Sequence, residues 1–214
     1  MDKQKKTAIV HEVKLIEAGD MVVHAQKHRQ GGFEPDSISL WKQYKGNGVM
    51  LDIGAYTGIY GLSAAVQGHN VIAFEPNPAT FKRIRENMRV NNVDFPIYNV
   101  ALWKEKCRKT LVMTNGWMTS AANLFSNDGK QKTEIQCLPL DDFYDKIPNV
   151  GFIKIDAERS ESAILEGAKR IIKRDSPKIL MEQLKGELEA NQILQDWGYS
   201  RRKLSQNMEF WEKC

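Results

Sequence analysis

From residue 49 onward, the apolar positions of the chain follow two alternating patterns. Short continuous apolar runs, typical of strands buried on both faces, alternate with stretches in which apolar residues recur at helical spacing. The apolar runs predict strands at residues 48–54, 70–76, 96–103, 150–157 and 176–184. The stretches with helical spacing predict helices at residues 58–68, 77–93, 161–174 and 187–198. Strands and helices that alternate with short connections predict a parallel sheet covered by helices on both faces.

The two ends of the chain depart from this alternation. Residues 1–48 lack it and are predicted to form an N-terminal appendage or cover over the main domain, residues 49–214. Two extended segments at the C-terminus, 199–204 and 207–214, are predicted to close the sheet as an antiparallel pair. The expected fold is therefore an α/β Rossmann-like sandwich with a mostly parallel sheet and an antiparallel C-terminal edge.

Composition adds limits to this picture but no function. With 42% hydrophobic and 27% charged residues, and no apolar run near the roughly 18 residues of a membrane span, the chain is typical of a globular domain with no membrane partner. Its three cysteines are widely separated and lack metal-ligand spacing, which favours a reducing, cytoplasmic location. A net charge of +4 is too small to predict a nucleic-acid partner.

The turn after the first predicted strand carries the candidate chemistry. Asp52 precedes Gly54 and Gly58, but residue 56 is Tyr56, so the dinucleotide pattern G-x-G-x-x-G is not met. A carboxylate at Asp52 would repel a pyrophosphate, whereas S-adenosylmethionine has no phosphate and carries an ammonium group. Glu75 ends the next strand, where an acid can accept hydrogen bonds from ribose hydroxyls.

Several segments, in this order, resemble the FkbM family of S-adenosylmethionine-dependent methyltransferases, over most of residues 31–183. They are GFEPDSISL, LDIGAYTGIYG, AFEPNP, NVALW, LPLDDFYDKIPNVGFIKIDAERSESAILEGA and ILMEQ. The resemblance implies methyl transfer to a hydroxyl oxygen of a sugar, polyketide or similar small acceptor. By position, it implies a methionine site at Asp52, Gly54, Tyr56 and Gly58, a ribose site at Glu75, and an adenine site near Asn77, Ala101 and Leu102.

One residue departs from the family pattern. The family usually has D-x-E-G after the fourth strand, whereas this chain has Asp156, Ala157, Glu158 and Arg159. Arg159 puts a long cation where the family has glycine. The local turn and the type of acceptor are the properties that this change affects.

Four carboxylates are candidate catalytic residues, because an alcohol must lose its proton when it is methylated. Asp156, Glu158 and Glu182 follow two predicted strands, and Glu34 lies in the N-terminal cover. Asp156 is also expected to line the cofactor site. Three roles are compatible with these acids. In the first, one of them acts as a general base or orients the acceptor. In the second, several of them hold a divalent metal ion, and in the third they only shape the pocket. The sequence leaves these alternatives open, and no metal ligand is assigned.

Two other functions are compatible with parts of the pattern. A nicotinamide-dependent oxidoreductase would share the fold and Glu75, but the glycine spacing and Asp52 argue against it. A cofactor-binding module without catalysis is the second alternative, because Arg159 departs from the family pattern. The oligomeric state and the acceptor are left open.

Overall fold

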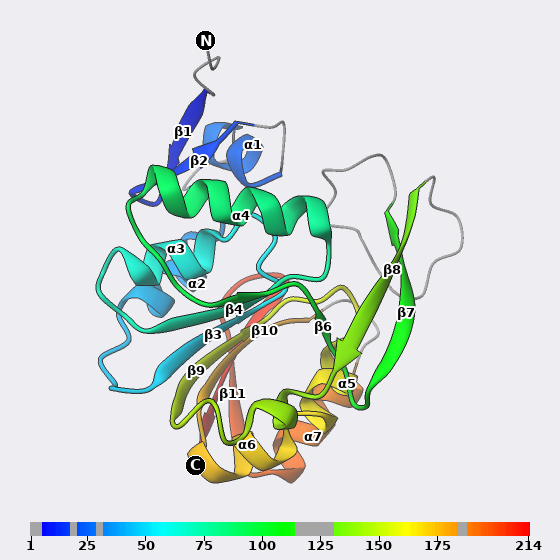
Figure 1. Ribbon diagram of the computed structural model, residues 1–214. Helices are drawn as coiled ribbons and strands as arrows, with labels where there is room; N and C mark the ends of the chain where they lie inside the picture. The colour runs from blue at the N-terminus through cyan, green and yellow to red at the C-terminus, as the bar shows by residue number, and fades with distance from the viewer. Residues whose placement is uncertain (1–5, 18–20, 29–31, 114–130, 184–187) are drawn as a thin grey trace.

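The computed structural model describes residues 6–17, 21–28, 32–113, 131–183 and 188–214. Its centre is a seven-stranded sheet in the order β11-β12-β10-β9-β3-β4-β5 (Figure 1). The strands are β3 (Val49–Ile53), β4 (Val71–Phe74), β5 (Ile97–Tyr98), β9 (Val150–Ile155), β10 (Lys178–Glu182), β11 (Tyr199–Lys203) and β12 (Met208–Lys213). The five strands from β5 to β10 pair in parallel, and β12 pairs antiparallel with both β10 and β11. The predicted sheet and its antiparallel C-terminal edge are confirmed.

Helices cover both faces of this sheet (Figure 1). One side carries α2 (Pro35–Lys42), α3 (Ile59–Ala65) and α4 (Pro78–Val90), and the other carries α5 (Glu161–Glu166), α6 (Lys169–Asp175) and α7 (Glu189–Asp196). Each layer is held by its own cluster of buried apolar side chains, one with Trp41 and Met50, the other with Leu51 and Trp211. Among the described residues, no helix is long and apolar enough to span a membrane.

The N-terminal segment packs into the same core as the sheet. It forms a hairpin of β1 (Thr7–Val10) and β2 (Val13–Ile16), followed by α1 (Met21–His28) and α2. The indole of Trp41 is fully buried and donates a hydrogen bond to the carbonyl of Tyr60 in α3. Asn87 of α4 accepts a hydrogen bond from the amide of Ile16 and donates one to the carbonyl of Thr57. The segment is thus tied to two helices that flank the turn after β3.

Two elements differ from the sequence prediction, the strand at 96–103 and the helix at 161–174. The strand predicted at 96–103 is broken into β5 and β6 (Ala101–Leu102), which lie in different sheets. Asn99 donates hydrogen bonds to the carbonyls of Glu75 and Pro76, and these bonds divert the chain between the two strands. β6, β8 (Gln131–Leu138) and β7 (Cys107–Met113) form a second, three-stranded sheet.

The helix predicted at 161–174 is also divided, into α5 and α6. At Gly167, an added Cβ would lie 2.1 Å from the carbonyl oxygen of Trp103. The helix layer and the segment after β6 therefore come together at this glycine, between α5 and α6.

Candidate active site

The turn after β3 is built from residues with positive φ. Gly54, Tyr56 and Gly58 have φ values of 73°, 51° and 79°, in the left-handed region that glycine tolerates best. A Cβ at Gly54 would lie 1.9 Å from the carbonyl oxygen of Asp156, and one at Gly58 would lie 2.9 Å from Ile84. These two glycines are therefore required by the protein's own packing, because β9 and α4 approach the turn closely.

Asp52, just before this turn, is fully buried. Its Oδ2 accepts a hydrogen bond of 2.9 Å from the amide of Gly61, which fixes the first turn of α3 against β3. Burial raises the pKa of Asp52, and the nearby Lys154 acts in the opposite direction. The carboxylate is enclosed by protein, so its predicted contact with a methionine moiety stays a prediction.

Lys154, which the sequence analysis missed, is the buried cation of the site. It lies in β9, is 3% exposed, and donates a 2.9 Å hydrogen bond to the carbonyl of Gly54. Its Nζ lies 3.4 Å from Oδ2 of Asp156 and 3.7 Å from Oδ1 of Asp52. Burial favours the neutral amine, but Asp156, Asp52 and Glu34 outweigh this effect and raise the pKa of Lys154. A charged residue inside the apolar run 150–155 was the sequence feature that could have revealed it.

Glu34 reaches the same place from the N-terminal segment. It precedes α2 with a φ of 41° and accepts a hydrogen bond from the hydroxyl of Tyr60. Burial first, and Glu34 second, raise the pKa of Tyr60 well above its usual range. Because Glu34 also raises the pKa of Lys154, the structure brings Glu34 and Asp156 to one buried ammonium group.

The other candidate acids gather where β9 and β10 end. Burial raises the pKa of Glu182 to about 10, and Asp156 and Glu158 add to this shift. Burial raises the pKa of Glu158 to about 7, with further contributions from Asp156 and Glu161. Both glutamic acids therefore retain their protons to a higher pH than an exposed glutamic acid does. Within the parts of the chain that are described, no group of three or more His, Cys, Asp or Glu residues has the geometry of a metal site.

A cleft of about 410 Å³ opens beside Glu182. Its walls come from the segment after β9, the end of β10 and the start of α7. Arg159, Glu182 and Leu188 line it, and the Leu188 side chain is 71% exposed. Arg159 has a φ of 79°, so the residue that stands where the family has glycine adopts a backbone conformation that favours glycine.

Glu75 ends β4 and is almost fully buried. It accepts three hydrogen bonds of 2.8 Å, from the amides of Tyr56 and Asn77 and from the hydroxyl of Thr80. Burial raises its pKa, and these donors act in the opposite direction. A carboxylate has about four acceptor positions, so roughly one remains for a ligand. The acid thus connects the glycine turn to the start of α4.

The three residues expected near adenine lie on two elements, the start of α4 and β6. Asn77 caps α4, where its side chain accepts a 3.0 Å hydrogen bond from the amide of Ala79. Ala101 and Leu102 are buried in β6, beside β8 in the second sheet. Their contact with a nucleoside stays a prediction.

Comparison with known proteins decides the family. The sequence profile of the methyltransferase FkbM domain matches residues 52–201, well over half of the chain. The chain belongs to the FkbM methyltransferase family. The family prediction is therefore confirmed, and the family argues against the nicotinamide alternative. None of the curated proteins that were compared matches the chain.

Solved structures agree with the FkbM family in fold. The FkbM methyltransferase of Methylobacillus flagellatus is 20% identical, with a TM-score of 0.55 over 79% of this chain and 45% of its own. The tRNA (uracil-54, C5)-methyltransferase of Pyrococcus abyssi, solved with S-adenosyl-L-homocysteine, is 14% identical, with a TM-score of 0.57 over 98% of this chain and 44% of its own. The chain spans less than half the length of either relative. The class I methyltransferase fold predicted from the sequence is confirmed.

Proposed function

We propose that this FkbM-family chain transfers a methyl group from S-adenosylmethionine to a hydroxyl of a small or saccharide-type acceptor. The observation that carries the proposal is the group of acids at the ends of β9 and β10, in which the pKa of Glu158 is raised to about 7. A general base works best when its pKa lies near the working pH. This cluster adjoins the glycine turn because the Asp156 carbonyl contacts Gly54.

The residues present fit the cofactor chemically. S-adenosylmethionine carries a sulfonium and an ammonium, and the acids around Lys154 favour a cationic ligand. Glu75 retains one acceptor position for a ribose hydroxyl. To accept hydrogen bonds from both ribose hydroxyls, Glu75 would have to lose its bond from Tyr56, Asn77 or Thr80. When bound, the cofactor supplies an electrophilic methyl group. The remaining cofactor positions stay as proposed from the family resemblance: Asp52, Gly54, Tyr56 and Gly58 for the methionine moiety, and Asn77, Ala101 and Leu102 for adenine.

In the proposed mechanism, Glu158 and Glu182 have different roles. Glu158 takes the proton of the acceptor hydroxyl, and protonated Glu182 donates a hydrogen bond that orients the acceptor in the adjoining cleft. Lys154 holds Asp156 and the glycine turn in place, and the negative charge of Glu34 favours the charged ammonium. A divalent ion held by the same acids remains the alternative to a carboxylate base.

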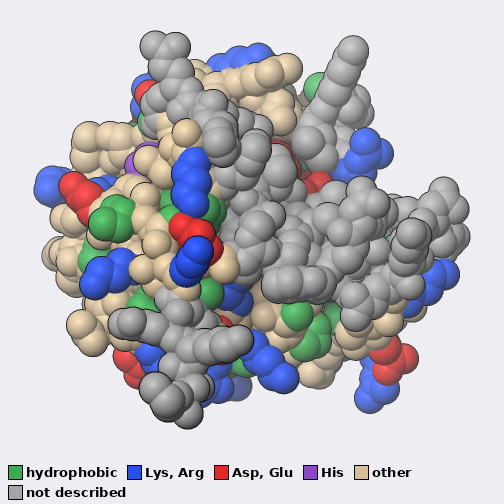
Figure 2. Space-filling view, turned by 90° about the horizontal axis from the view of Figure 1, so that it is seen from above, with side chains coloured by type: hydrophobic (Ala, Val, Ile, Leu, Met, Phe, Trp, Pro, Cys, Tyr) green, Lys and Arg blue, Asp and Glu red, His purple; other side chains and the backbone are tan. Residues whose placement is uncertain are grey.

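Nucleic acid is not proposed as the acceptor, although one relative of similar fold acts on tRNA. Figure 2 shows Lys and Arg side chains interspersed with acidic ones over the described surface of the face that it views. Nucleic-acid sites instead gather basic side chains on one face. RNA is therefore included among the acceptors in the methyl-transfer assay, where we expect it to receive no methyl group.

The cofactor part of the proposal is tested by binding. Titration calorimetry should detect binding of S-adenosylmethionine, and Glu75→Gln should weaken it by about tenfold or more, because one charge-assisted hydrogen bond is lost. Gln keeps the shape of Glu75, and Glu105→Gln, at an exposed position, is the matched control. Tight NADH binding without any response to S-adenosylmethionine would overturn the proposal.

The catalytic part is tested by transfer of a radiolabelled methyl group to sugars, glycans and RNA. Glu158→Gln should lower the rate by about 100-fold or more while cofactor binding is retained, since general bases contribute factors of that order. Good cofactor binding with no transfer to any acceptor would favour the non-catalytic module. An unchanged rate in the Gln variant would remove Glu158 from the mechanism.

A further inference from the structure

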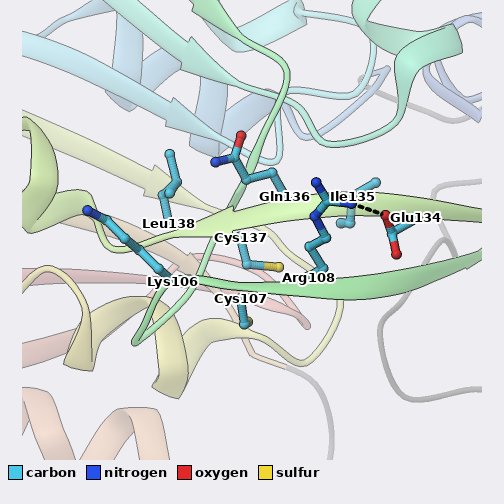
Figure 3. Close-up of a pocket in the computed structure, with 8 residues that line it drawn as sticks. All are labelled: Lys106, Cys107, Arg108, Glu134, Ile135, Gln136, Cys137 and Leu138. Atoms are coloured by element: carbon cyan, nitrogen blue, oxygen red, sulfur yellow. Dashed lines mark hydrogen bonds and ion pairs between the residues drawn. The ribbon is translucent and has the colours of Figure 1, made fainter.

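Two of the three cysteines face each other across the second sheet. Cys107 of β7 and Cys137 of β8 are directly opposed partners in the antiparallel ladder. Opposed residues in such a ladder have Cα atoms about 4.5 to 5.5 Å apart, within the range that a disulfide bridges. Figure 3 shows both side chains leaving their strands on the same side, opposite to Arg108 and Gln136. The distance of 30 positions in the sequence hides this pairing, which only the strand register reveals.

The two thiols are in contact and differ in access. Burial first, and the charge of Cys107 and a hydrogen bond between the two thiols second, raise the pKa of Cys137 to about 12. Cys137 is fully buried among apolar side chains that include Ala163 of α5. Cys107 is only half-buried, on the edge strand of its sheet. A reagent in solution therefore meets Cys107 first.

Two basic residues flank Cys107 along the edge strand β7, with side chains that leave the strand on the opposite side from the thiol (Figure 3). A cleft of about 400 Å³ lies along this part of the sheet and is lined by Lys106 and Arg108 as well as by both cysteines (Figure 3). The two basic side chains are 70% and 77% exposed, and each forms an ion pair with an acid, Asp142 or Glu134. Exposed ion pairs of this kind are weak, so these cations can also contact a carboxylate of a small ligand that reaches around the open edge of β7 to Cys107.

We propose that Cys107 and Cys137 form a reversible intramolecular disulfide by exchange with a small anionic disulfide such as oxidised glutathione. The thiolate of Cys107 attacks one sulfur of glutathione disulfide, the S–S bond breaks, and one glutathione thiolate leaves. The thiolate of Cys137, once its proton passes to water, attacks the Cys107 sulfur of the mixed disulfide and releases the second glutathione. Both cysteine sulfurs are oxidised, and one glutathione disulfide is reduced to two thiols.

The bond would be easily reversed. Opposed residues have Cβ atoms about 4.5 to 5.5 Å apart, at or beyond the upper end of the roughly 3.5 to 4.5 Å of a relaxed disulfide, so we expect a bond between these strands to carry some strain. Strained disulfides are the more readily reduced ones. Because Cys137 also pairs with Ala101 on its other side, the modification lies at the centre of the three-stranded sheet.

The test uses the full chain in glutathione buffers of increasing oxidised fraction, followed by alkylation of free thiols and peptide mass spectrometry. We expect a cross-linked pair of peptides that contain Cys107 and Cys137, and dithiothreitol should reduce this cross-link. Exposed Cys214 should at most carry glutathione, so it reports on the reagent within the same molecule. A Cys214→Ser variant should form the same cross-link.

Two further variants separate the steps. Cys137→Ala should stop at a mixed disulfide between Cys107 and glutathione, and Cys107→Ser should leave Cys137 unmodified because it is buried. The proposal is overturned if the unaltered protein accumulates only the mixed disulfide, if Cys107 stays reduced under conditions that fully modify Cys214, or if the cross-link joins Cys214. The unaltered chain and Cys214→Ser decide the question even if Cys137→Ala does not fold.

Discussion

Replacing Lys154 with methionine should destabilise the protein strongly while keeping the volume of the side chain. Lys154 lies 3.4 Å from Asp156 and 3.7 Å from Asp52, so each attraction amounts to about 4 to 5 kcal/mol at an effective dielectric constant of about 20. The cost of burying the ammonium offsets part of this gain. Removing one partner of a buried ion pair costs about 3 to 5 kcal/mol, which we expect for Lys154→Met. Domains have a total stability of only about 5 to 15 kcal/mol, so the loss will be easy to measure.

The assay is equilibrium unfolding in urea, followed by tryptophan fluorescence between pH 5 and pH 8. In Lys154→Met, Asp52 is fully buried without its cation, so its folded-state pKa rises further above the unfolded value. The folded state then holds a proton that the unfolded state has released, and the free energy of unfolding falls as pH rises through this window. The deficit of the variant should therefore be larger at pH 8 than at pH 5.

Two companion variants make the result specific. Asp52→Asn combined with Lys154→Met should recover part of the loss, with a coupling of about 1 to 3 kcal/mol. Lys104→Met removes an exposed ion pair with Glu166, at 4.0 Å, and should change the stability by less than about 1 kcal/mol. A loss below about 1 kcal/mol in Lys154→Met, with no dependence on pH, would refute the argument that this ammonium holds the site together.

Two further predictions concern the turn and the acids beside the cleft. Arg159→Gly should stabilise the protein by about 1 kcal/mol because Arg159 has a φ of 79°, and an unchanged or lower melting temperature would contradict this. Glu158 and Glu182 have pKa values raised from 4.5 to about 7 and about 10, so the folded state retains their protons and the free energy of unfolding should fall as pH rises from about 5 toward 9. Glu182→Gln should flatten this fall in urea-midpoint measurements, whereas a profile identical to that of the unaltered protein would show that Glu182 ionises normally.

The sequence predicted those parts of the structure that depend on local pattern. Buried parallel strands are continuous apolar runs, so β3, β4, β9 and β10 were found, and the acids that follow them were assigned to one edge of the sheet. The break at Asn99 was missed because it depends on hydrogen bonds to Glu75 and Pro76, on a neighbouring segment. Apolar periodicity carries no information about such bonds.

Lys154 was missed in the candidate site for a different reason. Lys154 acts through contacts with Asp52 and the Gly54 carbonyl, which are distant in sequence and meet only when β3 and β9 pair. The glycine turn was recognised, but its glycines were expected to admit a ligand. The structure shows that Gly54 and Gly58 make room for Asp156 and Ile84.

The side chain of Asn87 has a consequence for any attempt to shorten the protein to its sheet and helices. Its carboxamide joins the amide of Ile16, in the first hairpin, to the carbonyl of Thr57, beside the cofactor turn proposed above. Deleting the hairpin would leave Oδ1 of Asn87 without this donor and would open its surroundings to water. A shortened protein that starts at Val49 would therefore have a less rigid turn after β3. This turn is the proposed cofactor site, so binding measured on the shortened protein would not represent the full chain.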